Sequence, residues 1–217
     1  MKIGIDEAGR GPVIGPLVVC AYATDKDVEA EDSKKLSKNK RKEIRERLEK
    51  EGIYEILVLD AEELNKMMKT KNLNEIEIDL FIKALKNLVK KHNLKNLEVY
   101  IDSCSTNSEK LKEKIKSKIK DIDVKKLVVE HKADEKYKVV SAASIIAKTE
   151  RDRLIEKLKN KYGDFGSGYP SDPKTIRFLE NYYKKYKGFP KIVREKWKTC
   201  EKIKAKFSQL KLFGVIR

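Results

Sequence analysis

The order of strand-like and helix-like segments is the feature that most constrains the fold of this chain. Three β-rich runs come first, at Lys2–Asp6, Leu17–Thr24 and Tyr54–Asp60. Two further strand-like runs, Leu97–Asp102 and Val124–Glu130, then alternate with segments of helical periodicity. Strands in succession followed by alternating strands and helices predict an α/β fold, a mixed sheet covered by helices.

Apolar residues at helical spacing predict the remaining elements. We expect helices, in chain order, over Lys38–Glu51, Glu75–His92, Ser108–Ile119, Val139–Tyr162, Asp172–Tyr186 and Val193–Phe207. The domain organisation that follows is one α/β domain over residues 1–169, with a basic helical C-terminal extension over residues 170–217 packed on it.

Positive charge is concentrated in the last third of the chain. The formal net charge is +16 over 217 residues. Residues 1–135 hold 29 Lys and Arg against 27 Asp and Glu, whereas residues 136–217 hold 22 against 8. This excess favours a polyanion-binding face, for which nucleic acid is the expected partner. A lysine-rich solubilising surface is the alternative that composition leaves open.

Several classes of protein are excluded by simple features. The longest apolar run, Val13–Ala23, is short and contains Gly15 and Pro16, so no membrane span fits there. Acidic residues stand where a signal peptide needs an apolar stretch. The three cysteines are far apart, which argues against a zinc knuckle or a disulfide framework. We therefore expect a cytoplasmic protein, with a monomer as the default.

Four acidic residues are candidates for catalysis because they stand where strands end. Asp6 and Glu7 close the first strand, Asp102 closes another, and Asp134 follows the strand Val124–Glu130. Ligand sites of open α/β sheets gather beyond the carboxyl ends of strands. Taken singly, each acid is more often a turn or helix cap than a ligand. Together they point to a metal-dependent phosphodiester enzyme.

Clustered carboxylates without histidine suit Mg²⁺ or Mn²⁺ rather than zinc. Two such ions are the usual apparatus for in-line attack on a phosphodiester. Neighbouring strand residues point to opposite faces, so the joint use of Asp6 and Glu7 requires the backbone to leave strand geometry at Glu7. The adjacent Gly9, Arg10 and Gly11 offer backbone N–H groups and a guanidinium to a sugar or phosphate, although such a short turn is a weak signal.

A series of motifs resembles the ribonuclease HII family, and its archaeal branch most closely. The first is GIDEAGRGP, which begins at Gly4. The others follow in the family's order: DSKKL from Asp32, YID ending at Asp102, HKAD ending at Asp134, VSAASIIAK from Val140, RDR from Arg151 and GSGYPSDP from Gly166. The resemblance covers residues 2 to about 200, and so many motifs in one order exclude coincidence.

The resemblance implies a ribonuclease H-like fold with a five-stranded mixed sheet. It implies an endonuclease that hydrolyses the RNA strand of RNA–DNA hybrids and incises 5′ to single ribonucleotides in duplex DNA, leaving 3′-hydroxyl and 5′-phosphate ends. Such an enzyme would serve replication and ribonucleotide excision repair. The family's catalytic, metal-binding acids fall on Asp6, Glu7, Asp102 and Asp134. Its ribose-sensing and substrate-binding residues fall on Gly9, Arg10, Gly11 and Tyr169, with Ser33 and Lys34 near the nucleic-acid backbone.

The resemblance also raises a sliding clamp as a partner. Archaeal members often end in a peptide of the form Q-x-x-hydrophobic-x-x-aromatic-aromatic. Here Gln209 and Leu212 fit, while Val215 and Ile216 occupy the aromatic positions. An ordinary frayed tail is the alternative.

Two other functions are alternatives to the ribonuclease. A non-catalytic nucleic-acid-binding protein could use the basic last third alone, but it would gain nothing from carboxylates beside phosphates. Another carboxylate nuclease on the same fold, such as a junction resolvase, would not need the Gly-Arg-Gly and Tyr169 motifs.

Overall fold

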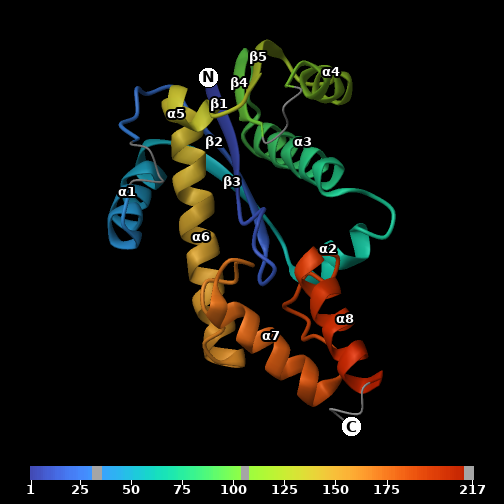
Figure 1. The fold of residues 1–217 in the computed structure, drawn as a ribbon. Helices are drawn as coiled ribbons and strands as arrows, with labels where there is room; N and C mark the ends of the chain where they lie inside the picture. The colour runs from blue at the N-terminus through green and yellow to red at the C-terminus, as the bar shows by residue number, and fades with distance from the viewer. Residues whose placement is uncertain (31–35, 104–107, 213–217) are drawn as a thin grey trace. The chain divides into compact units, whose positions relative to one another are not determined.

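A computed structural model of the chain describes residues 1–30, 36–103 and 108–212 (Figure 1). Its strands form one five-stranded sheet in the order β3-β2-β1-β4-β5. The strands are β1 (Lys2–Ala8), β2 (Leu17–Thr24), β3 (Ile53–Leu59), β4 (Leu97–Asp102) and β5 (Val124–Glu130). β1 is antiparallel to β2 and parallel to β4, and β4 is parallel to β5. The mixed sheet predicted from the element order is confirmed.

The helices largely follow the predicted segments. They are α1 (Lys38–Glu51), α2 (Ala61–Met67), α3 (Leu73–His92), α4 (Ser108–Lys118), α5 (Ala133–Lys136), α6 (Lys138–Tyr162), α7 (Pro173–Tyr186) and α8 (Lys198–Leu212). The sequence reasoning missed the short helices α2 and α5. No helix among the described residues is both long enough and apolar enough to cross a membrane.

Two predicted boundaries are wrong for reasons of tertiary pairing. The first strand was expected to end at Asp6, but β1 continues because Glu7 and Ala8 pair with β2. The last helix was expected from Val193, but α8 begins at Lys198. Val193 is taken up by an isolated antiparallel bridge with Ile14. The local spacing of apolar residues around Val193 does not indicate that Ile14 is its partner.

The chain forms two compact units, each assembled from separated segments. The sheet unit contains residues 1–8, 18–58 and 72–152, and the helical unit contains residues 9–17, 59–71 and 153–217. The chain leaves the sheet unit at Gly9, whose φ of 89° is easily adopted by a residue without Cβ. The helical unit thus takes in more than residues 170–217, and the division of the chain at residue 170 stays a prediction.

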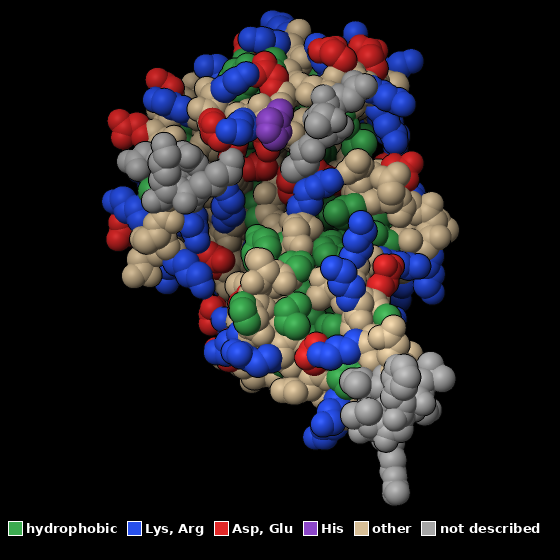
Figure 2. All heavy atoms as spheres, viewed as in Figure 1, with side chains coloured by type: hydrophobic (Ala, Val, Ile, Leu, Met, Phe, Trp, Pro, Cys, Tyr) green, Lys and Arg blue, Asp and Glu red, His purple; other side chains and the backbone are tan. Residues whose placement is uncertain are grey.

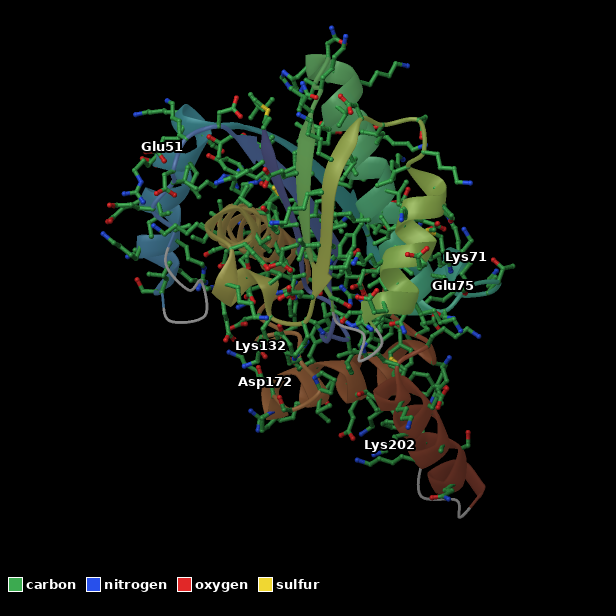
Figure 3. The ribbon with its side chains drawn as sticks, turned by 90° about the horizontal axis from the view of Figure 1, so that it is seen from above. Glu51, Lys71, Glu75, Lys132, Asp172 and Lys202 are labelled. Atoms are coloured by element: carbon green, nitrogen blue, oxygen red, sulfur yellow. The ribbon has the colours of Figure 1, made fainter. Side chains whose placement is uncertain are left out.

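Helices cover both faces of the sheet within the sheet unit (Figure 3). α1 and the first part of α6 share one face, where Arg41 pairs with Asp152 at 2.9 Å. α3 and α4 share the other, where Lys118 pairs with Asp79 at 2.8 Å. The start of α6 packs directly on β1. The approach is so close that a side chain at Gly4 would overlap the carbonyl of Val139.

The helical unit has an apolar core of its own. Its buried members come from the loop after β1, the end of α6, α7, the segment before α8 and α8 itself: Val13, Ile14, Ile155, Phe165, Leu179, Ile192, Val193, Cys200 and Ile203. The loop of residues 9–17 is therefore packed into a core made mostly by the C-terminal part of the chain.

Candidate active site

Asp6 of β1 and Asp102 of β4 each follow directly on one of two neighbouring strand residues, Ile5 and Ile101. β1 and β4 are parallel with Ile5 beside Ile101, so the next residue of each strand points to the same face; β4 ends there, and β1 continues to Ala8. Asp6 is 4% exposed. Burial raises the pKa of the Asp6 carboxyl well above its usual range, and the charges of Glu7 and Asp102 raise it further. Asp6, Glu7 and Asp102 thus lie close enough to interact electrostatically, and their use as one site stays a prediction.

Asp134 is carried to the same strand end by α5. Oδ1 of Asp102 accepts a hydrogen bond from the backbone N–H of Ala133, the first residue of α5, at 2.7 Å. Asp134 is the next residue and is buried. The left-handed conformation of Lys132, with a φ of 59°, turns the chain from β5 into this helix. The end of β4 thus determines where Asp134 is placed.

Glu7 lies inside β1, paired with Val19 of β2. The departure from strand geometry that the joint use of Asp6 and Glu7 was expected to require does not occur, because the strand persists to Ala8 and the turn comes at Gly9. The requirement was too strict, because the charge of Glu7 still lies close enough to raise the pKa of Asp6. The side chains of Asp6 and Glu7 consequently start toward opposite faces of the sheet. The two residues are nevertheless linked, because the N–H of Glu7 donates to Oδ1 of Asp6 at 2.7 Å.

Ser144 and Lys148 of α6 belong to this cluster, and sequence reasoning did not assign them to it. A hydrogen bond from the Ser144 side chain and the positive charge of Lys148 both lower the pKa of Asp6, against the larger effects that raise it. Residues four apart lie on one helix face. A serine followed four residues later by a lysine, within the motif that begins at Val140, was the available signal.

The acids suit a hard divalent cation by their chemistry. Among the residues that the structure describes, no three Asp, Glu, His or Cys side chains are gathered closely enough to surround a metal ion. Carboxylate oxygens are the ligands that Mg²⁺ and Mn²⁺ prefer. A bound cation would also remove the repulsion that Glu7 and Asp102 exert on the ionised form of Asp6. The donor set therefore fits the predicted metal.

The ribose-sensing candidates come together in the helical unit. A Cβ on Gly11 would lie 3.4 Å from Cε1 of Tyr169, so the glycine faces the tyrosine ring. The carbonyl oxygen of Gly168 accepts hydrogen bonds from Val13 N at 2.8 Å and Ile14 N at 3.2 Å. These bonds join the loop of residues 9–17 to the loop that carries Tyr169, whose side chain stays 42% exposed.

The loop before Tyr169 is held by two polar side chains. Oδ2 of Asp172 (labelled in Figure 3) accepts from Ser167 N at 2.6 Å. The hydroxyl of Thr175 accepts from Gly168 N at 3.0 Å and donates to the carbonyl of Phe165 at 2.8 Å. The N–H of Ser167 and the other donors lower the pKa of Asp172 to about 2. These hydrogen bonds hold the loop that carries Tyr169 in one conformation.

The predicted site residues divide between the two units. Asp6, Glu7, Asp102 and Asp134 belong to the sheet unit, and Gly9, Arg10, Gly11 and Tyr169 belong to the helical unit. The chain connects the two groups through Ala8. Ser33 and Lys34 lie outside the described residues. Lys and Arg side chains are spread over the face of the molecule seen in Figure 2.

Comparisons with known proteins agree on one family. A family model described as Ribonuclease HII matches residues 3–200. A Ribonuclease HII of Methanocaldococcus jannaschii is 54% identical over 224 residues, which cover 97% of both chains. The crystal structure of ribonuclease H2 from Pyrococcus horikoshii OT3 is 42% identical, with a TM-score of 0.86 over 96% of this chain and 99% of that one. RNase HII from Archaeoglobus fulgidus, solved in a complex with PCNA, is 41% identical, with a TM-score of 0.82 over 94% and 96%.

Proposed function

Since the chain belongs to the ribonuclease HII family, whose enzymes cut the RNA of RNA–DNA hybrids and ribonucleotides in DNA, we propose which of its residues perform each part of that reaction. The chain is an endonuclease of this type. Cleavage is proposed at the edge of the sheet where β1 and β4 end. The observation that carries this assignment is the burial of Asp6 beside two further carboxylates that raise its pKa.

Asp6, Glu7, Asp102 and Asp134 are proposed to hold Mg²⁺ or Mn²⁺, two ions acting together. When bound, such ions activate a water molecule and stabilise the leaving oxygen of the phosphodiester. Burial of Asp6 and its repulsion by Glu7 and Asp102 support this role, because a bound cation would offset the cost of keeping these carboxylates close and ionised.

The residues around the acids prepare them for this task. Ser144 donates a hydrogen bond to Asp6, and the charge of Lys148 favours its ionised form. Both effects favour the ionised carboxylate that a cation needs as a ligand, against the larger opposing effect of burial. Asp102 uses Oδ1 to hold Ala133, and its charge lies close enough to Asp6 to raise the pKa of that group.

Gly11 and Tyr169 are proposed to recognise the ribose. Gly11 is exposed and has no side chain, so its backbone can approach a sugar closely. The exposed ring of Tyr169 beside it provides an apolar face for the neighbouring sugar. The 2′-hydroxyl is the group that distinguishes RNA from DNA at such a site. Gly9 and Arg10 would complete the recognition loop, with Ser33 and Lys34 near the backbone of the substrate.

The basic last third is proposed to attract the duplex. Residues 136–217 carry 22 Lys and Arg against 8 Asp and Glu, and they include α6, α7 and α8. Residues 170–217 would act as the basic extension of the catalytic domain. Affinity for the duplex should therefore fall steeply with salt, while the choice of cleavage position should not.

The proposal is tested with duplex DNA that carries one ribonucleotide, and with an all-DNA duplex of the same sequence. Mg²⁺ and Mn²⁺ are supplied in turn. We expect one nick, on the 5′ side of the ribonucleotide, with 3′-hydroxyl and 5′-phosphate ends, and none in the control. Equal cutting of both duplexes would overturn the ribose-sensing assignment.

A sliding clamp is proposed as a second partner. The Archaeoglobus fulgidus relative is seen in a complex with PCNA, and the tail here retains Gln209 and Leu212 of the clamp-binding pattern. Gln209 is exposed at the end of α8. Val215 and Ile216, which stand in the aromatic positions, lie outside the described residues.

A further inference from the structure

Arg194 is a fully buried cation that bridges the loop of residues 9–17. Its side chain is 0% exposed. Nε donates to the carbonyl oxygen of Gly15 at 2.8 Å, and one terminal nitrogen donates to the carbonyl oxygen of Arg10 at 3.1 Å. One guanidinium therefore joins two carbonyl groups that are five residues apart in the loop. The roles proposed for the four acids and for Tyr169 do not explain why a buried guanidinium bonds to this loop.

Trp197 holds the next carbonyl of the same loop. Its indole N–H donates to the oxygen of Gly11 at 3.1 Å. The guanidinium of Arg194 lies over the indole ring, 5.0 Å from its centroid. The two side chains therefore form one assembly, in which a cation–π contact supports both hydrogen-bond donors.

The loop is held differently along its length. From Val13 onward the N–H groups bond to backbone: Val13 N and Ile14 N donate to Gly168, and Gly15 N donates to Ile192, while the Gly15 carbonyl is held by Arg194. Before Val13, the carbonyls of Arg10 and Gly11 are held by the side chains of Arg194 and Trp197. The orientation of these two peptide groups thus depends on side chains about 185 residues away in the sequence.

We propose that Arg194 and Trp197 are positioning residues for ribose recognition. The peptide bond between Arg10 and Gly11 is trans, so its N–H points away from its carbonyl. Because the Arg10 carbonyl faces Arg194, the N–H of Gly11 is directed away from the guanidinium. This donor is thereby kept in one orientation at an exposed residue beside Tyr169. The inference rests on the proposed role of Gly11 in sensing the ribose.

Arginine is required here by geometry as well as by charge. A guanidinium presents several N–H groups in a fixed planar fork, whereas a lysine ammonium is a single flexible point charge. Lysine at position 194 would keep the charge but could not hold the Gly15 and Arg10 carbonyls in the same directions. Phenylalanine at position 197 would keep an aromatic ring and remove only the N–H donor.

The experiment measures ribose preference as a ratio of dissociation constants. Duplexes with and without one ribonucleotide are bound, with Mg²⁺ present, to protein carrying Asp102→Asn to slow cleavage. Arg194→Lys and Trp197→Phe are then added separately. We expect each to reduce the ribose preference by about 5- to 10-fold, the effect of one displaced hydrogen bond. Affinity for the all-DNA duplex should stay unchanged.

Ile203→Val is the matched control. Ile203 is buried in the same core as Val193 and Cys200, and its shortening lowers stability without removing a hydrogen bond to the loop. The control should keep the full ribose preference at a melting temperature as low as that of the test variants. Loss of preference in the control as well would reduce Arg194 to a structural residue and overturn the inference.

Each remaining outcome bears either on the positioning role of Arg194 and Trp197 or on ribose sensing by Gly11. If Arg194→Lys does not fold, as judged by circular dichroism, Trp197→Phe alone decides. Full preference in the folded variants overturns the positioning role and leaves the proposed function intact. Absence of any preference in the parent protein contradicts ribose sensing by Gly11 itself, and the inference falls with it.

Discussion

The carboxylate of Asp102 and the backbone of Ala133 are joined by a hydrogen bond of 2.7 Å. This single contact ties the end of β4 to the first residue of α5 and so places Asp134 next to the strand end. One acid of the proposed metal site therefore positions another. A change at Asp102 can act through its charge or through this bond, and two substitutions separate the effects.

Asp102→Asn should abolish most of the cleavage and preserve the fold. Its amide oxygen can still accept from Ala133, whereas its neutral side chain no longer serves as an anionic metal ligand. We expect the single-turnover rate to fall by more than about 100-fold, with duplex binding largely retained in an anisotropy titration. A variant that keeps the full rate would show that the metal assignment is wrong.

Asp102→Ala is the companion change. It removes the acceptor as well as the charge and leaves the N–H of Ala133 without this bond. We expect a loss of about 1–2 kcal/mol in the free energy of unfolding beyond that of Asp102→Asn. Equal stability of the two variants, measured by urea titration, would mean that the bond to Ala133 does not position α5.

Asp6→Asn should stabilise the metal-free protein while it inactivates the enzyme. The folded state raises the pKa of Asp6, so the ionised form is disfavoured by folding. Stability is therefore lost as the pH rises from the unfolded pKa through the folded one. A neutral amide avoids this cost and can still accept from Glu7 N.

Thermal melts in EDTA between about pH 5 and about pH 8 test whether the ionisation of Asp6 lowers stability as the pH rises. Asp6→Asn should melt above the unmodified protein at the upper end of the range, with a difference that shrinks as the pH falls. Added Mg²⁺ should raise the melting temperature of the unmodified protein more than that of the variant. A variant that melts lower at neutral pH would contradict the electrostatic account.

Gly11→Ala should leave the fold intact and impair ribose recognition. The added methyl group would lie 3.4 Å from Cε1 of Tyr169, which is an ordinary contact distance. We expect a change in stability within about 0.5 kcal/mol. The cleavage rate at a single ribonucleotide should fall by about 10-fold or more, because the methyl group occupies the approach of the sugar.

Gly4→Ala and Tyr169→Ala are comparison variants for Gly11→Ala, the first for stability and the second for ribose recognition. A methyl group at Gly4 would overlap the Val139 carbonyl, so this variant should unfold readily. Tyr169→Ala should lower discrimination between ribose and deoxyribose more than it lowers the melting temperature, because the ring is 42% exposed. Unchanged cleavage by Gly11→Ala would remove Gly11 from the recognition site.

Deletion of residues 209–217 should separate catalysis from clamp binding. These residues follow the buried core of α8, so we expect the truncated protein to melt within a few degrees of the full chain and to nick a linear duplex at the same rate. An archaeal sliding clamp loaded on a circular duplex should stimulate only the full chain. Stimulation of both proteins would place the clamp contact elsewhere.

The sequence by itself determined most of the helices and strands and the family, and from these the candidate residues of the site. β2, β4, β5 and α1 have the predicted bounds, because each is encoded by the local spacing of its apolar residues. The four acids became candidates because each stands at or just beyond the end of a strand-like run, and the motif order identified the family. These signals lie within short stretches of chain.

Only the tertiary structure decided how those parts meet. The pairing of Ile5 with Ile101 sets Asp6 beside Asp102, and pairing with β2 keeps Glu7 in the strand. Ser144 reaches Asp6 because α6 packs against β1. Arg194 reaches Arg10 and Gly15 across about 180 residues of chain. Such contacts depend on register and packing between distant segments, which no local pattern of side chains encodes.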